Sequence, residues 1–165
     1  MPDQNAPMPT RRLLSSEGEY QQGIDEVLFR ACHRLLIFDR VLYPRWDQPR
    51  RADVLRRLCL ANPRNTVCIA LHDPESMLRD TPRLFSMLQT CAHAISIHRT
   101  QGEALRAQDP LVVADGRHFV HRFHLDGSRG VVVTDDPERT QPLLQRFEQI
   151  WAACSPGLSG TTMGL

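Results

Sequence analysis

The order of apolar patterns along the chain is the feature that most limits its fold. Up to about residue 100, stretches with apolar residues three and four apart alternate with short apolar runs, as in chains that place helices between strands. After that point, strand patterns follow directly on one another, and one helix pattern closes the sequence. Alternation followed by consecutive strands predicts an α/β fold with a mixed β-sheet flanked by helices.

The predicted elements follow from these periods and from the turn residues between them. The first helix is expected over residues 17–32, behind Ser15 and Ser16, whose hydroxyls suit an N-cap. Further helices are predicted over residues 51–61, 82–94 and 137–154. Strands are predicted over residues 34–42, 65–73, 94–100, 109–116, 117–127 and 129–136. Asp126-Gly127 is the expected hairpin turn between the last two strands.

A chain of 165 residues has room for one domain of ordinary size. We predict this domain over residues 12–154, after a flexible proline-containing leader of residues 1–11 and before a flexible Gly- and Ser-rich tail of residues 155–165. The sequence lacks both an apolar run of roughly eighteen residues and the apolar core of a secretory signal. A cytoplasmic protein with no membrane partner is therefore expected.

The composition excludes some chemistry. All 20 basic residues are arginine, so a reaction that needs a lysine amine is excluded. The five cysteines contain no Cys-x-x-Cys pair, a pattern that favours reduced thiols over a disulfide framework or a zinc site. We accordingly predict no metal and no cofactor.

The end of the chain carries a resemblance to a known family. The segment "VVVTDDPERTQPLLQRFEQIW" (residues 131–151) resembles the closing strand and helix of the phospholipase D superfamily, and the helix, strand, helix and "NTVCIAL" of the first half fit the same pattern. The resemblance covers residues 12–154. It implies a phospholipase D-like fold, of bacterial type, and a homodimer, because members of this family usually bring two copies of their active signature together.

That active signature is largely missing here. In the family it is His-x-Lys-x-x-x-x-Asp, in which histidine attacks phosphorus, lysine holds phosphoryl oxygens and aspartate orients the histidine. Asp115 keeps the aspartate place, whereas Gln108 stands at the histidine place and Pro110 at the lysine place. A glutamine amide cannot form a phosphoenzyme, and proline carries no positive charge. Since Asp115-Gly116 is also a common turn dipeptide, we interpret Asp115 as a turn residue.

The histidines that follow leave two interpretations open. In the family pattern, Gly-Ser-x-Asn comes next; here His121, Arg122 and His124 occupy the glycine, serine and asparagine places. His118, His121 and His124 recur every third residue, so on a strand they cannot converge on one metal ion. They are either structural or solvated, or His121 or His124 forms a replacement anion site with Arg122 and Arg117.

Two further features involve charged residues. "RRADVLRR" (residues 50–57) places Arg50, Arg51, Arg56 and Arg57 around one helix, and its interpretations are a salt-bridged surface or a nucleic-acid contact. A net charge of +1 and an aromatic content of 6% argue against nucleic acid. Asp39, inside an apolar strand, is a carboxylate that needs a partner, with Arg40 and Arg45 nearby in sequence.

Three functions remain, in this order. The first is a non-catalytic phospholipase D-like pseudoenzyme that acts as an interaction or assembly module, as a homodimer or with an unknown protein partner. The second is a divergent phosphodiesterase or phosphotransferase that uses His121 or His124 with Asp115 as the orienting carboxylate. The third is a phosphate or nucleic-acid binding module, in which Arg117 and Arg122 bind the anion.

Overall fold

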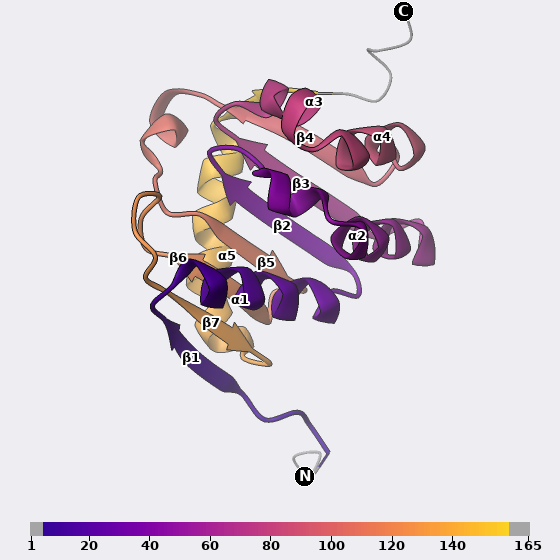
Figure 1. Ribbon diagram of the computed structural model, residues 1–165. Coiled ribbons are helices and arrows are strands. Elements are labelled where there is room, and N and C mark those ends of the chain that lie inside the picture. Colours follow the sequence, from indigo (N-terminus) through magenta and orange to yellow (C-terminus); the bar gives the residue numbers. More distant parts are fainter. Residues whose placement is uncertain (1–4, 159–165) are drawn as a thin grey trace, which may run out of the picture.

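The computed structural model describes residues 5–158 and contains one mixed eight-stranded sheet (Figure 1). Its spatial order is β1-β7-β6-β5-β2-β3-β4-β8. The central strands β2, β3 and β4 run parallel, and the other neighbours pair antiparallel. The strands are β1 (Thr10–Leu14), β2 (Arg34–Asp39), β3 (Thr66–Leu71), β4 (Ile95–Thr100), β5 (Leu111–Ala114), β6 (His118–Arg122), β7 (Gly130–Thr134) and β8 (Cys154–Pro156). The predicted mixed sheet flanked by helices is confirmed.

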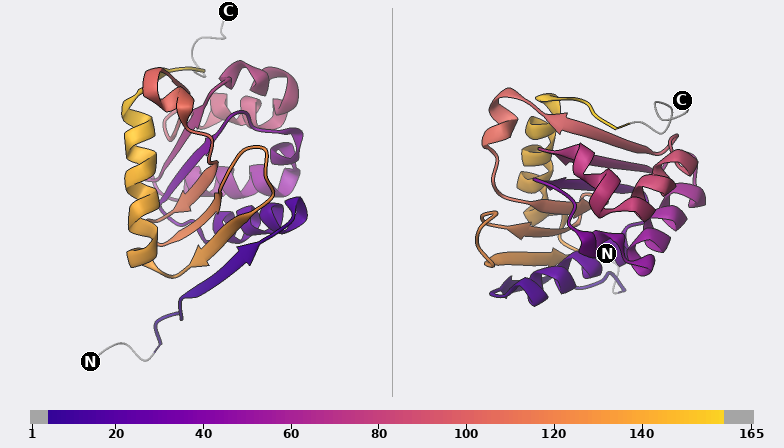
Figure 2. Two further views of the ribbon diagram at one scale, coloured as in Figure 1. Left: turned by 90° about the vertical axis from the view of Figure 1, so that its left-hand side faces the viewer. Right: turned by 45° about the horizontal axis from the view of Figure 1, so that its top comes forward.

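The helices cover the two faces of the sheet unequally (Figures 1 and 2). One face carries α1 (Glu17–Arg30), α2 (Pro49–Ala61), α3 (Met77–Asp80) and α4 (Pro82–Thr90). The other carries the long helix α5 (Pro137–Ala152). Three 3-10 turns complete the connections, at η1 (Pro44–Asp47), η2 (Pro74–Ser76) and η3 (Gly102–Arg106).

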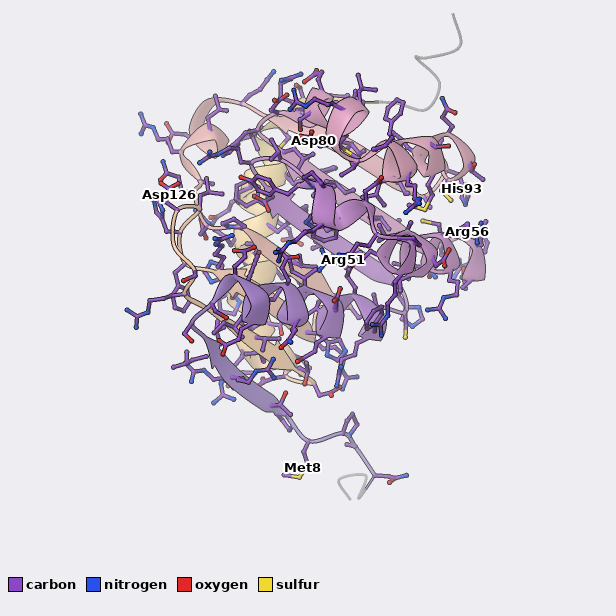
Figure 3. All side chains as sticks on the ribbon, in the orientation of Figure 1. Met8, Arg51, Arg56, Asp80, His93 and Asp126 are labelled. Carbon is purple, nitrogen blue, oxygen red and sulfur yellow. The ribbon has the colours of Figure 1, made fainter. Side chains whose placement is uncertain are left out.

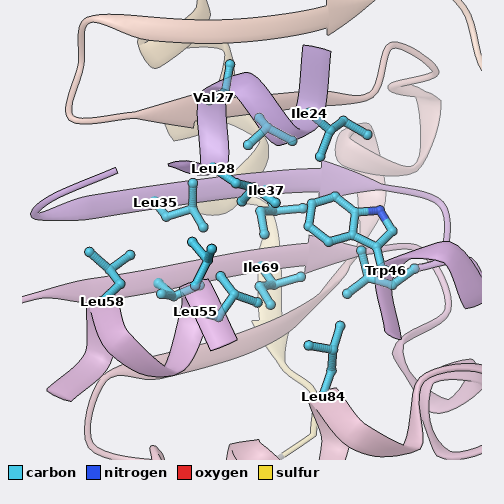
Figure 4. Packing of buried hydrophobic residues seen from close by; sticks show 14 of the residues in the cluster. Ile24, Val27, Leu28, Leu35, Ile37, Trp46, Leu55, Leu58, Ile69 and Leu84 are labelled. Carbon is cyan, nitrogen blue, oxygen red and sulfur yellow. The ribbon is translucent and has the colours of Figure 1, made fainter. Parts of the chain in front are cut away.

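Two hydrophobic cores result because successive side chains on a strand point to opposite faces. On β2, Leu35 and Ile37 belong to the core beneath α1, α2 and α4, whereas Leu36 and Phe38 belong to the core beneath α5. Figure 4 shows the first core, in which the indole of Trp46 packs beside Ile37 and Ile69. Because both faces are buried, β2 reads in the sequence as an unbroken apolar run rather than an alternating one.

The ends of the helices follow local chemistry. Ser16 is the N-cap of α1, as predicted, and its Oγ accepts a hydrogen bond from the Glu19 backbone N–H at 3.2 Å. Asp136 caps α5 in the same way, through the Arg139 N–H at 2.9 Å. The helix predicted over residues 82–94 ends earlier, at Thr90, and a turn leads from there into β4.

The sheet includes residues outside the predicted domain bounds of 12–154. β1 begins at Thr10 and pairs with β7, and β8 extends to Pro156 and pairs with β4. Both are edge strands with mostly exposed or half-buried side chains, so they lack the apolar alternation that marks a strand in a sequence. Residues 1–4 of the predicted leader and 159–165 of the predicted tail lie outside the described residues.

Candidate functional site

Most of the residues to which the resemblance assigns chemistry lie at one edge of the sheet. This edge is formed by the ends of central strands and not by an edge strand. β5 runs antiparallel to both β2 and β6, with Phe38 paired to Leu111 and Leu111 paired to His121. The end of β2, the start of β5 and the end of β6 therefore meet at this edge. Gln108 and Pro110 precede β5 here, and the loop after β6 returns to them: Leu125 N–H donates to the Gln108 carbonyl at 2.7 Å.

On the α1 face of this edge lies a cluster of ionisable groups. Arg122 forms an ion pair with Glu17, with 3.0 Å between Nη2 and Oε2, and its guanidinium lies 5.2 Å from the ring centre of Tyr20. Its Nε also donates to the carbonyl of Gly127. The backbone N–H of Arg122 donates to the Pro110 carbonyl at 2.9 Å, which ties the end of β6 to the residue before β5.

Asp39 completes this cluster from the end of β2. Burial raises its pKa to about 7, against the opposing effects of a backbone hydrogen bond from Arg40 and of the positive charges of Arg122 and Arg40. Only 8% of the residue is exposed, and Oδ1 accepts the Arg40 N–H at 2.7 Å. Burial, with the Asp39 charge second, also raises the pKa of the Tyr20 phenol. This edge therefore holds a carboxyl group that can change charge near neutral pH.

On the α5 face of the same edge lies a separate polar triad. His121 Nε2 lies 2.9 Å from Oδ2 of Asp109, and Arg146 of α5 donates to both oxygens of that carboxylate, at 2.7 and 3.3 Å. Burial raises the pKa of Asp109, but the hydrogen bonds from His121 and Arg146 outweigh this effect and lower it to about 2. Phe123 packs edge-on against the imidazole. The candidate histidine His121 is thus engaged with an anion through Nε2.

Asp115 lies at the opposite end of β5 from this edge. Its backbone has a positive φ of 55°, and its carboxylate accepts three hydrogen bonds of 2.8 Å from the backbone N–H groups of Cys32, His33 and Arg34. These bonds join the turn after β5 to the start of β2. The carboxylate acts here as an acceptor for the backbone at a turn.

Arg117 and His118 lie near Asp115 at the same far end. Arg117 forms a 3.4 Å ion pair with Asp135, and the ring Nδ1 of buried His118 accepts the Asp135 N–H at 3.0 Å. Burial lowers the pKa of His118. The four residues His118, Arg117, Asp135 and Asp115 thus form a polar group remote from the edge that holds Gln108.

The candidate anion-site residues do not converge. His121 and Arg122 are neighbours on β6, so they point to opposite faces of the sheet. His124 lies in the loop beyond β6, half exposed, where its Nδ1 accepts the Asp126 N–H at 3.1 Å. Arg117 and Asp115 are at the other end of the strands. A replacement site built from His121 or His124 with Arg122, Arg117 and Asp115 is therefore not assembled in this structure.

The segment "RRADVLRR" divides between core and surface. Arg51 is 2% exposed; its Nε donates to Asp25 at 2.8 Å, and its Nη2 donates to the carbonyl and side chain of Gln21. Arg50, Arg56 and Arg57 stay exposed. Figure 3 labels Arg51 within the fold and Arg56 at the periphery.

The part of the chain that the structure describes contains no group of three His, Cys, Asp or Glu side chains arranged to hold a metal ion. Its helices also include none with the length and apolar character needed to cross a bilayer.

A family model described as "Domain of unknown function (DUF7931)" matches residues 17–159, which is most of the chain. The chain belongs to the DUF7931 family. No curated protein matches it. The matched region of this DUF7931 domain contains both polar clusters and both ends of β5.

Solved structures show which fold the DUF7931 chain adopts. A phospholipase D family member, Nuc from Salmonella typhimurium, superposes with a TM-score of 0.63 at 13% identity, over 92% of this chain and 100% of Nuc. NucT from Helicobacter pylori gives 0.56 at 12% identity, over 91% of this chain and 100% of NucT. The archaeal chromatin protein TrmBL2 gives 0.65 at 10% identity, over 94% of this chain and 57% of TrmBL2. The fold is therefore phospholipase D-like, as the sequence resemblance implied.

Sequence reasoning missed four members of the two clusters. Glu17 and Tyr20 looked like ordinary residues of an amphipathic helix, and Arg146 and Asp109 carried no motif. The pattern of the DUF7931 sequence offered one usable signal, the carboxylate of Asp39 within an apolar run. The positive charge of Arg122 acts on the Asp39 carboxyl group, although the two residues are 83 positions apart in the sequence. Only the pairing of β2, β5 and β6 brings them together.

Proposed function

We propose that this DUF7931 domain is a non-catalytic phospholipase D-like module that acts by binding and assembly. One observation carries the proposal: Gln108 and Pro110 precede the start of β5, where the resemblance places the family's catalytic histidine and lysine. Phosphoryl transfer by the family's mechanism needs a nucleophilic side chain at the first of these places and a positive charge at the second. Gln108 and Pro110, at the histidine and lysine places, supply neither a nucleophile nor a charge.

The rival proposal, a rebuilt phosphodiesterase, has less support. It needs Asp115 to orient His121 or His124, and Asp115 lies across the length of β5 from both, with its oxygens bonded to backbone. The side chain of His124 is 52% exposed, and its ring is held by Asp126 of its own loop rather than by Asp115.

An interaction module needs a partner, and a second copy of this chain is the partner that we propose first. The homodimer rests on the family pattern, in which two copies face each other. DNA is the alternative partner. The same fold occurs in TrmBL2, a chromatin protein whose structure is described as showing a novel mode of DNA binding. The molecular mass of the purified protein in solution, from analytical ultracentrifugation, tests the homodimer: a monomer at all concentrations would remove it.

Hydrolysis of an activated phosphodiester tests the loss of catalysis. Purified protein is incubated with bis(4-nitrophenyl) phosphate and a chelator, alongside His121→Ala, His124→Ala and Asp115→Asn. We expect every sample to release nitrophenolate at the rate of buffer alone. Turnover that disappears in Asp115→Asn and in one histidine variant, with both variants folded by circular dichroism, would overturn the proposal and establish a rebuilt active site.

A further inference from the structure

The exposed face of α2 presents arginines beside surface hollows. A hollow of about 690 Å³ lies between α1 and α2, and its lining includes Arg50, Arg56, Arg57 and the exposed ring of Phe29. A second hollow, of about 340 Å³, lies between α2 and α4 and includes Arg83 and Ser86 in its lining. Asp53 and Arg56 line both hollows. The two hollows therefore adjoin on either side of these two side chains of α2, and we call the pair of hollows the α2 furrow.

The charge of the α2 furrow is strongly positive. Four guanidinium groups line it, from Arg50, Arg56, Arg57 and Arg83, against the single carboxylate of Asp53. Asp53 lies 3.4 Å from Arg56. Within residues 5–158, no acidic side chain lies within ion-pair distance of Arg50 or Arg57. Since the whole chain carries a net charge of only +1, this concentration is a local feature of the surface.

The spacing of the arginines indicates a ligand with several anionic groups. Arg50 and Arg57 are seven positions apart on α2, which is about 10 Å along a helix axis. Arg83 lies on another helix, so the guanidinium groups are spread over two helices and two hollows rather than gathered at one point. The ligand that matches this arrangement is an extended chain of phosphates, because a guanidinium can make two parallel hydrogen bonds to each phosphate.

An aromatic ring at one end of the furrow adds a second kind of contact. The Arg50 guanidinium lies 4.2 Å from the ring centre of Phe29, and Phe29 is 38% exposed. Arginine planes and aromatic rings are the surfaces on which unpaired bases stack.

We infer that the α2 furrow binds single-stranded nucleic acid, with Arg50, Arg56, Arg57 and Arg83 holding phosphates and the Phe29–Arg50 pair stacking a base. This inference gives the alternative partner of the proposed function a site and a chemical form, and it holds whether or not the protein forms a homodimer. The furrow lies over α1, α2 and α4, and its lining does not include Gln108, His121 or Asp115. Hydrolysis by the protein would overturn the loss of catalysis and leave furrow binding to be judged by its own measurement.

Fluorescence anisotropy with a labelled oligothymidylate of roughly 12 nucleotides tests the inference. The variant Arg50→Gln/Arg57→Gln is compared with Arg79→Gln/Arg106→Gln, which removes the same charge from exposed arginines outside the furrow. We expect the furrow variant to bind at least about tenfold more weakly and to lose about 1.4 from the slope of log K against log salt, as expected for two lost phosphate contacts to a single strand. The control should bind within about twofold of the wild type.

A third variant separates stacking from charge. Phe29→Leu keeps an apolar side chain and removes the ring, so we expect binding about fivefold weaker at an unchanged salt slope. Four results would overturn the inference: no binding by the wild type at low salt, equal losses in the furrow and control variants, tighter binding of a duplex of the same length, or full competition by polyglutamate at equal charge.

Discussion

His121 Nε2 lies 2.9 Å from Oδ2 of Asp109, at the edge of the sheet to which the resemblance assigns catalysis. Arg146 holds the other oxygen of the same carboxylate at 2.7 Å. The carboxylate therefore receives one partner from β6 and one from α5, and the contact joins strand to helix. Replacement of Asp109 should therefore lower the stability of the fold.

We predict that Asp109→Asn lowers the free energy of unfolding at pH 7 by about 1–3 kcal/mol, because His121 and Arg146 lose a charged acceptor that is largely shielded from water. The pKa of Asp109 is lowered to about 2, so its contribution is complete above the usual carboxyl range and is lost as the pH falls toward 2. Urea denaturation at several pH values measures this. Asp126→Asn, at a carboxylate 79% exposed, is the control and should change stability by less than about 0.5 kcal/mol. Equal stabilities of Asp109→Asn and wild type at pH 7 would contradict the prediction.

Asp39 should give the opposite pH dependence. Its pKa is raised to about 7 by burial, so the native state holds a proton that the unfolded chain releases near its ordinary value of 3.8. Stability therefore falls as the pH rises from about 4 to 7, by as much as about 1.4 kcal/mol for each pH unit in that interval. Asp39→Asn carries no titrating group and should show a flatter profile, with its advantage over the wild type greatest above pH 7. Parallel profiles for the two proteins between about pH 5 and 8 would contradict this.

Asp115 should matter through the backbone groups that it binds. Asp115→Ala removes the acceptor of three N–H groups and places alanine at a φ of 55°, so we expect a loss of roughly 2–4 kcal/mol in the free energy of unfolding. Asp115→Asn tolerates this φ and keeps one acceptor oxygen, and should lose about 1 kcal/mol. Chemical denaturation ranks the two. If alanine were tolerated as well as asparagine, the turn would not depend on these hydrogen bonds.

Arg51 is an arginine with a core position. Replacing it with alanine leaves Asp25 and the Gln21 carbonyl without their donor and opens space beside Trp46, so we expect a loss of about 3–5 kcal/mol in the free energy of unfolding. Arg51→Lys keeps the charge but not the planar fork that reaches both partners, and most of the loss should remain. Thermal unfolding monitored by circular dichroism measures both. Wild-type stability in Arg51→Lys would mean that the charge alone suffices.

Much of the fold could be predicted from the sequence because it depends on local repetition. The stripe of Tyr20, Ile24, Val27 and Leu28 marks α1, and the apolar run from Leu35 to Phe38 marks β2, because a helix or a doubly buried strand leaves its period in the residues themselves. β1 and β8 were not predicted, because they lack such a period. Edge strands bury few side chains, so Thr10–Leu14 and Cys154–Pro156 show no apolar period.

The candidate site was less predictable, because its members are distant in sequence. Asp109 and Arg146 are separated by 37 positions, and Arg51 and Asp25 by 26. The sequence pattern of "RRADVLRR" does not distinguish its four arginines from one another. Arg51 turns inward because its position on α2 faces the core and Asp25 is there to receive it, while Arg50, Arg56 and Arg57 remain on the surface.

The sequence by itself determined the class of fold and most of its helices and strands, and the resemblance predicts that Gln108 and Pro110 stand at the places of the family's histidine and lysine. These are properties of residue type and period, which neighbours along the chain decide. Tertiary structure alone decided that His121 meets Asp109, that Arg122 meets Glu17, and that Asp115 bonds to the backbone of residues 32–34. The physical reason is strand pairing. Register and face set which side chains share a space, and two adjacent residues such as His121 and Arg122 are sent to opposite sides of the sheet.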